Sequence, residues 1–228
     1  MKFKGILIGE ASGSVASNTF SHNRGGQYIR QRAIPVNTNT VFQQAVRNTM
    51  SLLTSNWLSV LTAAQRSAWE SYAAAVPITD TLGEPRNIGG IAMYCRSNVG
   101  RIQAGLARID VAPTTFNLGS FTNPGVGTVS ASADTVGITF TNTDAWAIAA
   151  GGFMGVWLSR PQNPSINYFK GPYRFGGVIL GAASPPTSPA TITAPFVFGV
   201  GHKIFIQIRV GQVDGRYSSP FRTVGIGA

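Results

Sequence analysis

The chain has 228 residues, of which 43% are hydrophobic and 11% are charged, with 27 glycines and 13 prolines. This composition is too apolar for a disordered chain, and its charge is below the roughly 25% of a typical soluble domain. The net charge of +10 is spread along the chain without a run of four basic residues, which argues against specific nucleic-acid recognition. We therefore expect a turn-rich fold whose surface is largely covered by neighbouring subunits. The alternative is an unusually neutral secreted monomer.

The single cysteine, Cys95, excludes an internal disulfide and a cysteine-based structural zinc site. Residues 1–14 contain too few apolar positions for a signal peptide, and no stretch approaches the length needed to cross a membrane. We expect no cofactor, no metal and no membrane insertion, and a protein made in the cytoplasm.

Residues 1–34 are predicted to form an extended arm. A short strand is expected at 3–8, and a flexible connection at 10–14 leads to a hairpin over 15–33. The consecutive glycines Gly25 and Gly26 favour the tight turn of this hairpin. A hairpin of this size is marginal in water, so it needs either the helices or another chain to pack on.

The hairpin carries the candidate assembly residues of the arm. Tyr28, Arg30 and Arg32 share one face of its second strand, because side chains alternate along a strand. Such a face can bind phosphate groups, bind the carboxylates of a neighbouring chain, or simply be exposed to solvent. The full candidate set is Arg24, Tyr28, Ile29, Arg30 and Arg32.

Residues 35–112 are predicted to form a helical domain. Asn39 or Thr40 is placed as the N-cap of the first helix. Apolar residues at three- and four-residue steps give this helix one stripe: Val41, Phe42, Ala45, Val46, Met50, Leu53, Trp57 and Leu61.

Two further helices follow the first. Thr62 and Gln65 have the spacing of a capping box, and Trp69 and Tyr72 then begin an apolar stripe that Pro77 ends. A third helix is predicted over 91–106. Cys95 lies on its apolar face, where it is expected to be a small buried hydrophobic residue. Four residues are expected to form the helical core: Trp57, Leu61, Trp69 and Tyr72.

Residues 114–228 are predicted to form an all-β sandwich of the immunoglobulin or fibronectin type III kind. Short strands separated by turn residues recur at the spacing that such a sandwich needs. They are expected at 128–132, 136–141, 153–159, 173–180, 191–198, 203–210 and 217–224. The overall fold class is therefore α+β: an extended arm with a hairpin, a three-helix region, and a sandwich.

The sequence contains no motif that identifies a catalytic centre. Its acidic residues are mostly isolated in turns, and none shares a motif with His22 or His202. No serine lies in a G-x-S-x-G elbow, and no glycine-rich segment ends in the GK[ST] of a phosphate loop. We expect that the protein is not an enzyme.

Several segments carry recognisable patterns: SGSVASNTFSHNRGGQYIRQRAIPVNTNT, Leu61-Thr-x-x-Gln65-Arg-x-x-Trp69-x-x-Tyr72, and Tyr94-x-Arg96-x-Asn98. These segments resemble a broad family encoded by bacteriophages and prophages. Ala104-Gly105-Leu106 and the segment from Phe205 to Pro220 with Asp214-Gly215 extend the resemblance over most of the chain. The resemblance implies a gene among virion-morphogenesis genes, and it transfers no functional residue.

Together these patterns predict a structural subunit of a bacteriophage virion, made in the cytoplasm of the bacterial host. It would belong to the tail, the head–tail connector or the capsid surface, bind other virion proteins, and form a homo-oligomer. The alternative is a module on the particle exterior that binds host protein or glycan, with aromatic candidates Trp146, Tyr168, Phe169 and Tyr173. The third interpretation is a virion protein that contacts DNA through the basic arm.

Overall fold

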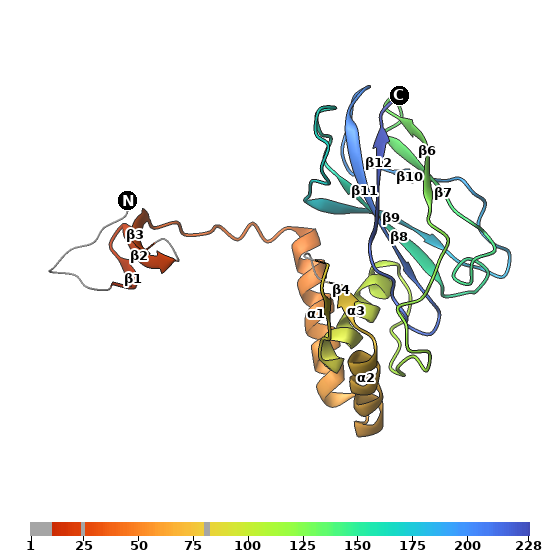
Figure 1. Ribbon diagram of the computed structural model, residues 1–228, viewed down its shortest axis with the longest axis horizontal. Helices are drawn as coiled ribbons and strands as arrows, with labels where there is room; N and C mark the ends of the chain where they lie inside the picture. Colours follow the sequence, from red (N-terminus) through yellow and green to blue (C-terminus); the bar gives the residue numbers. More distant parts are fainter. Residues whose placement is uncertain (1–10, 24–25, 80–82) are drawn as a thin grey trace. The chain divides into compact units, whose positions relative to one another are not determined.

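The computed structural model describes residues 11–23, 26–79 and 83–228 (Figure 1). The strand expected at 3–8 and the candidate residue Arg24 lie outside the described residues. The fold is mixed α and β. The chain divides into two compact units, residues 1–44 and 45–228, which are described separately below.

The N-terminal unit contains a small antiparallel sheet in the order β1-β2-β3. Its strands are β1 (Gly13–Val15), β2 (Asn18–Asn23) and β3 (Gly26–Gln31), so the predicted hairpin is present. β1 lies partly where a flexible connection was expected. It consists of three residues, and these pair with β2. Residues 32–40 follow without regular structure, and all of them are exposed.

Three helices follow in the described residues: α1 (Val41–Ser59), α2 (Ala63–Ala75) and α3 (Gly90–Gln103). The predicted capping box at the start of α2 is confirmed, since Thr62 and Gln65 exchange side-chain and backbone hydrogen bonds. The same exchange occurs before α1. The backbone N–H of Gln43 donates to the Thr40 hydroxyl oxygen, and the backbone N–H of Thr40 donates to the side-chain oxygen of Gln43. Of the two predicted N-caps, Thr40 makes these bonds, and each exchange satisfies helix N–H groups that lack an intrahelical partner.

The predicted apolar stripe of α1 is buried in its second half only. Leu53, Trp57 and Leu61 are buried against α2 and α3 in one core cluster. In the first half of the stripe, Val41, Phe42, Val46 and Met50 are exposed. Periodicity places residues on one face of a helix, but it does not supply an element of the same chain to cover that face.

A two-stranded ladder lies between α2 and α3. It pairs β4 (Ile78–Thr79) with β5 (Pro85–Arg86). Next to it, the Asn87 side chain donates to the backbone oxygens of Ala73 and Ala74 at the end of α2. The connection is therefore fixed to the helix that precedes it.

The C-terminal part is a sandwich of two antiparallel sheets (Figure 1). One sheet has the order β10-β7-β6, with β6 (Gly125–Ser130), β7 (Thr135–Thr139) and β10 (Ala190–Thr193). The other has the order β12-β11-β8-β9, with β8 (Phe153–Ser159), β9 (Tyr173–Leu180), β11 (Lys203–Gly211) and β12 (Phe221–Ile226). Each of the seven predicted strands overlaps one of these. β10 ends before Pro195 and β12 begins after Pro220, because proline has no N–H for the ladder.

Strand alternation builds the core between the two sheets. Ile204, Ile206 and Ile208 of β11 point inward and are fully buried, together with Val156 and Leu158 of β8. The intervening residues of β8 and β11 therefore point to the opposite face of the four-stranded sheet. That outer face carries Trp157, Gln207 and Arg209, and it forms part of the site described next.

Helix α3 is joined to the sandwich through a buried arginine. Arg101 is 6% exposed, and its guanidinium donates to the backbone oxygens of Ala107, Gly151 and Gln212 at 2.9–3.2 Å. Gly151 precedes β8 and Gln212 follows β11, so one side chain connects the helix to two loops of the sandwich.

Candidate functional site

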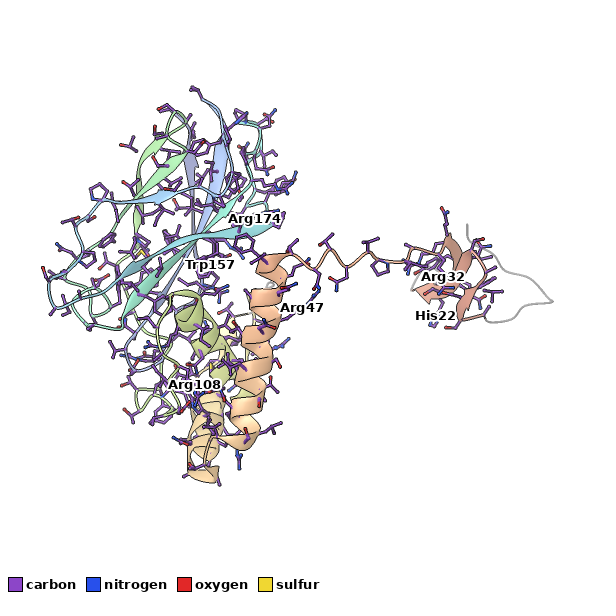
Figure 2. The ribbon with its side chains drawn as sticks, turned by 180° about the vertical axis from the view of Figure 1, so that it is seen from behind. His22, Arg32, Arg47, Arg108, Trp157 and Arg174 are labelled. Atoms are coloured by element: carbon purple, nitrogen blue, oxygen red, sulfur yellow. The ribbon has the colours of Figure 1, made fainter. Side chains whose placement is uncertain are left out.

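The arm candidates lie on β3 and just after it. Tyr28 and Ile29 are half-buried in the small sheet, where they pair with Ser21 and Phe20 of β2. Arg30 and Arg32 are exposed, and Figure 2 labels Arg32 with its side chain drawn. The arm therefore presents positive charge to solvent within its own unit.

The four helical candidates lie together in the core formed by α1, α2 and α3. Trp69 and Tyr72 are fully buried, and Trp57 and Leu61 are nearly so. The Trp69 ring lies 5.9 Å from the Tyr72 ring and 5.5 Å from the Tyr94 ring, both edge to face. These residues hold the helices together and are not available to a ligand.

The four aromatic candidates for an exterior binding site are not brought together on one surface. Trp146 is fully buried in the sandwich core, so its assignment as an exterior residue is wrong: it packs 5.3 Å from the Phe140 ring instead. Tyr168 and Phe169 are exposed in the loop before β9, and Tyr173 is half-buried at the start of that strand. Position in a loop is thus not enough to place a tryptophan on the surface.

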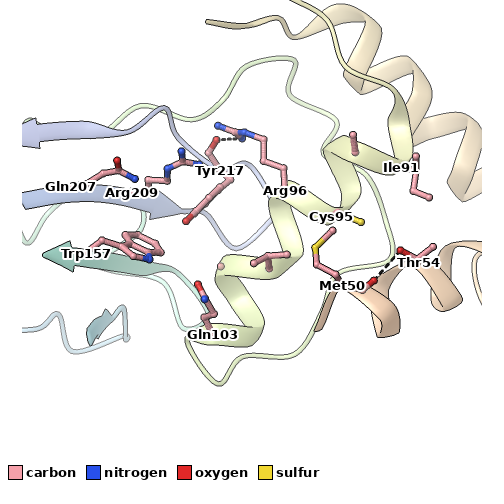
Figure 3. Close-up of a pocket in the computed structure, with 13 residues that line it drawn as sticks. Met50, Thr54, Ile91, Cys95, Arg96, Gln103, Trp157, Gln207, Arg209 and Tyr217 are labelled. Carbon is pink, nitrogen blue, oxygen red and sulfur yellow. Dashed lines mark hydrogen bonds between the residues drawn. The ribbon is translucent and has the colours of Figure 1, made fainter. Parts of the chain in front are cut away.

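A different site emerges where α1 and α3 approach the outer face of the four-stranded sheet. It is an open pocket of about 630 Å³ (Figure 3). Met50 and Thr54 come from α1, while Trp157, Gln207, Arg209 and Tyr217 come from the sandwich. The remaining lining residues all belong to α3: Ile91, Ala92, Cys95, Arg96, Val99, Gly100 and Gln103.

Two arginines and a tyrosine lie close together in this pocket. The guanidinium carbon of Arg96 lies 5.3 Å from the centre of the Tyr217 ring, and that of Arg209 lies 5.6 Å from it. Arg96 also donates to the backbone oxygens of Tyr217 and Ser218, which fixes its side chain. Guanidinium groups at such distances are attracted to the face of an aromatic ring.

Close helix packing brings α3 against Tyr217. A Cβ atom at Gly100 would lie 2.9 Å from the Tyr217 ring and hydroxyl, so any larger residue there would force the two apart. Tyr217 also stacks on Phe153 of β8, with ring centres 6.0 Å apart. Gly100 therefore allows the pocket to form.

The electrostatics of the pocket are dominated by uncompensated positive charge. Burial lowers the pKa of Arg96 to about 10, and the nearby positive charge of Arg209 acts in the same direction. Burial raises the pKa of the Tyr217 phenol to about 12, although the two arginines favour its ionised form. Among the described residues, neither arginine forms an ion pair; the ion pairs seen there join Arg108 to Asp110 and Arg216 to Asp214.

The described residues offer no group of three or more histidine, cysteine or acidic side chains that could hold a metal ion. In the same part of the chain, no helix has the length and apolar character required to cross a membrane. Burial raises the pKa of the Cys95 thiol, which disfavours the thiolate that a nucleophile or metal ligand needs.

Comparison of the chain with protein-family models, with curated proteins and with solved structures finds no match.

Sequence reasoning missed Trp157, Arg209 and Tyr217 as parts of one site. The alternation in 203–210 already indicates that Arg209 points away from the sandwich core. The sequence gives no sign that α3 approaches that outer face, because the contact between Arg96 and Tyr217 joins residues 121 positions apart.

Replacing Tyr217 with phenylalanine should reduce the loss of stability at alkaline pH. The pKa of this phenol is raised from 10.0 to about 12 in the folded chain. Its contribution to the free energy of unfolding is therefore complete below pH 10 and is lost as the pH rises through 12. One such group changes the free energy of unfolding by up to about 1.4 kcal/mol per pH unit. Urea denaturation at several pH values between 8 and 12 measures this slope.

The comparison at pH 8 serves as the internal control, since both proteins carry a neutral side chain at residue 217 there. An identical slope for the two proteins above pH 10 would show that the Tyr217 phenol is solvated in the folded state.

Proposed function

We propose that the protein is a structural subunit of a bacteriophage virion that acts through protein–protein assembly. The observation that carries this proposal is the exposed apolar face at the start of α1. Val41 is 80% exposed, Phe42 is 72% exposed and Val46 is 47% exposed. The resemblance of the sequence to phage-encoded proteins supports the virion as the setting, in the tail, the head–tail connector or the capsid surface.

The physical reason is the free energy of apolar burial, about 25 cal/mol for each Å² removed from water. An exposed apolar stripe on a helix is a typical protein-binding feature, whereas single exposed apolar residues are ordinary. Arg47 is the one charged residue in α1, so the desolvation penalty for covering this helix is small. Other virion proteins and further copies of this chain are the partners that we propose.

The sandwich is consistent with this role, and we assign it to the immunoglobulin-like or fibronectin type III-like class. Its first, second and fifth strands (β6, β7 and β10) form one sheet, and the other four form the second. In an immunoglobulin constant domain the fourth strand instead extends the sheet of the first, second and fifth. Here β9 lies beside β8, which leaves the four-stranded sheet with a broader outer face.

The test is whether the chain is part of the particle. Particles released from the bacterial host that carries the gene should be separated on a density gradient and washed at high salt, which screens contacts between charges. We expect the chain to sediment with the particles at a fixed ratio to the other virion proteins. A chain that stays in the soluble fraction would contradict the proposed function.

A pair of variants links this result to α1. Phe42→Glu combined with Val46→Glu should lower the copy number in particles, because both carboxylates would have to be buried in the contact. Asn48→Glu, which adds charge at another exposed position of the same helix, is the matched control and should assemble normally.

A further inference from the structure

The pocket between α1, α3 and the sheet contains two positive charges that no carboxylate of the described residues neutralises. Arg96 and Arg209 lie near the same tyrosine ring, and neither forms an ion pair with a described carboxylate. Both are half-buried, so solvent screens them less than it screens a surface arginine. A carboxylate placed between them would remove this repulsion and gain charge-assisted hydrogen bonds.

A second copy of the chain is poorly suited to supply that carboxylate. Five of the eight acidic side chains already accept hydrogen bonds within the subunit: Glu70, Asp110, Asp134, Asp144 and Asp214. The net charge of +10 also opposes the approach of an identical chain through a basic surface. Charge complementarity therefore favours a different, acidic protein.

Apart from the neutral polar residues Thr54, Gln103 and Gln207, the other lining residues of the pocket are apolar or small, and they define the second requirement for its occupant. Met50, Ile91 and Val99 form the wall on the helical side, and the half-buried Trp157 forms part of the opposite wall. Met50 is also part of the exposed face of α1, so the apolar surface continues from the pocket along that helix. An occupant must combine a carboxylate with apolar side chains.

We propose that this pocket docks an acidic, apolar segment of another protein of the assembly, with one of its carboxylates on Arg209 and Arg96. This inference rests on the proposed function, because it names the kind of partner that an assembly subunit would bind. The two arginines give specificity for the carboxylate, while the wall formed by α1 and α3 buries the neighbouring apolar side chains of the segment. Single-stranded nucleic acid is less suited, since its phosphates recur at every nucleotide and only two cations face this pocket.

The test uses the full chain and a defined pool of peptides. The probe is an equimolar pool of N-acetylated hexapeptide amides that contain leucine, phenylalanine and glutamate in random order, and the matched pool contains glutamine in place of glutamate. The chain is labelled with ¹⁵N-tryptophan, and the Trp157 indole signal, assigned with Trp157→Phe, reports occupancy of the pocket. We expect the glutamate pool to shift this signal with an apparent Kd roughly tenfold below that of the glutamine pool, the effect of one charge-assisted hydrogen bond.

Three variants tie the shift to the arginines. Arg209→Gln should remove the preference for glutamate, Arg209→Lys should retain part of it, and Arg160→Gln, at an exposed arginine outside the pocket, should leave it unchanged. Thermal unfolding of each variant shows whether it remains folded. Equal affinity for both pools, no shift with either pool, or a larger shift with the oligonucleotide dT12 would each overturn the proposal.

Particle sedimentation separates this proposal from the proposed function. Wild-type chain that enters particles but does not distinguish the peptide pools disproves docking at this pocket and leaves the role in assembly standing. Wild-type chain that is absent from particles disproves that role, whatever the peptides show.

Discussion

Replacing Trp69 with alanine should lower the free energy of unfolding by about 3–5 kcal/mol, the range for large core truncations. The side chain is fully buried and packs edge to face on Tyr72 and Tyr94. Its indole N–H also donates to the backbone oxygen of Asp110 at 3.0 Å, so the change removes a hydrogen bond and leaves a cavity. Urea denaturation followed by circular dichroism measures the loss.

Phe42→Ala is the matched control, because it also truncates an aromatic residue of the helical region but at an exposed position. It should change the free energy of unfolding by less than about 0.5 kcal/mol, as surface substitutions do. If the two variants were equally stable, Trp69 would not be part of the core and the helix packing described above would be wrong.

Removing residues 1–34 should leave a soluble, folded protein that no longer enters particles. The described part of this segment contributes β1, β2 and β3, which pair only with one another, while the cores of the helices and the sandwich consist of residues after Gln44. Extended segments commonly join subunits by adding a strand to a neighbour or covering its apolar surface. Circular dichroism and thermal unfolding test the fold, and particle sedimentation tests assembly.

A double variant of the full chain, Tyr28→Ala with Ile29→Ala, tests whether the apolar residues of the hairpin are responsible. It should reduce incorporation while keeping the length of the arm. If the truncated chain entered particles at the normal copy number, the assembly contacts would have to lie on α1 and the sandwich alone.

The sequence was sufficient to predict those elements whose signals are local. The start of α2 followed from Thr62 and Gln65, since a capping box needs only four consecutive residues. β11 followed from its alternating isoleucines, which one face of a sheet requires. β1 and the β4–β5 ladder were missed because strands of two or three residues have no measurable period.

Features that depend on distant segments could not be predicted in the same way. The stripe of α1 gave the correct face of the helix, yet whether Phe42 or Trp57 is buried depends on where α2 and α3 end. Trp146 was misplaced because its burial depends on the packing of two sheets around it. The pocket combines Arg96 with Arg209, and only the packing of α3 on the sheet brings them close.

The arginines of α3 have a mechanical consequence. Arg101 holds the loops around Gly151 and Gln212, and Arg96 holds the backbone at Tyr217 and Ser218. A force applied to α1 would pass through the helical core into α3, and from there into the sandwich at several separate points of its backbone. Several hydrogen bonds would then resist this force at the same time. The helices would therefore separate from the sandwich less readily than if a single hydrogen bond joined them.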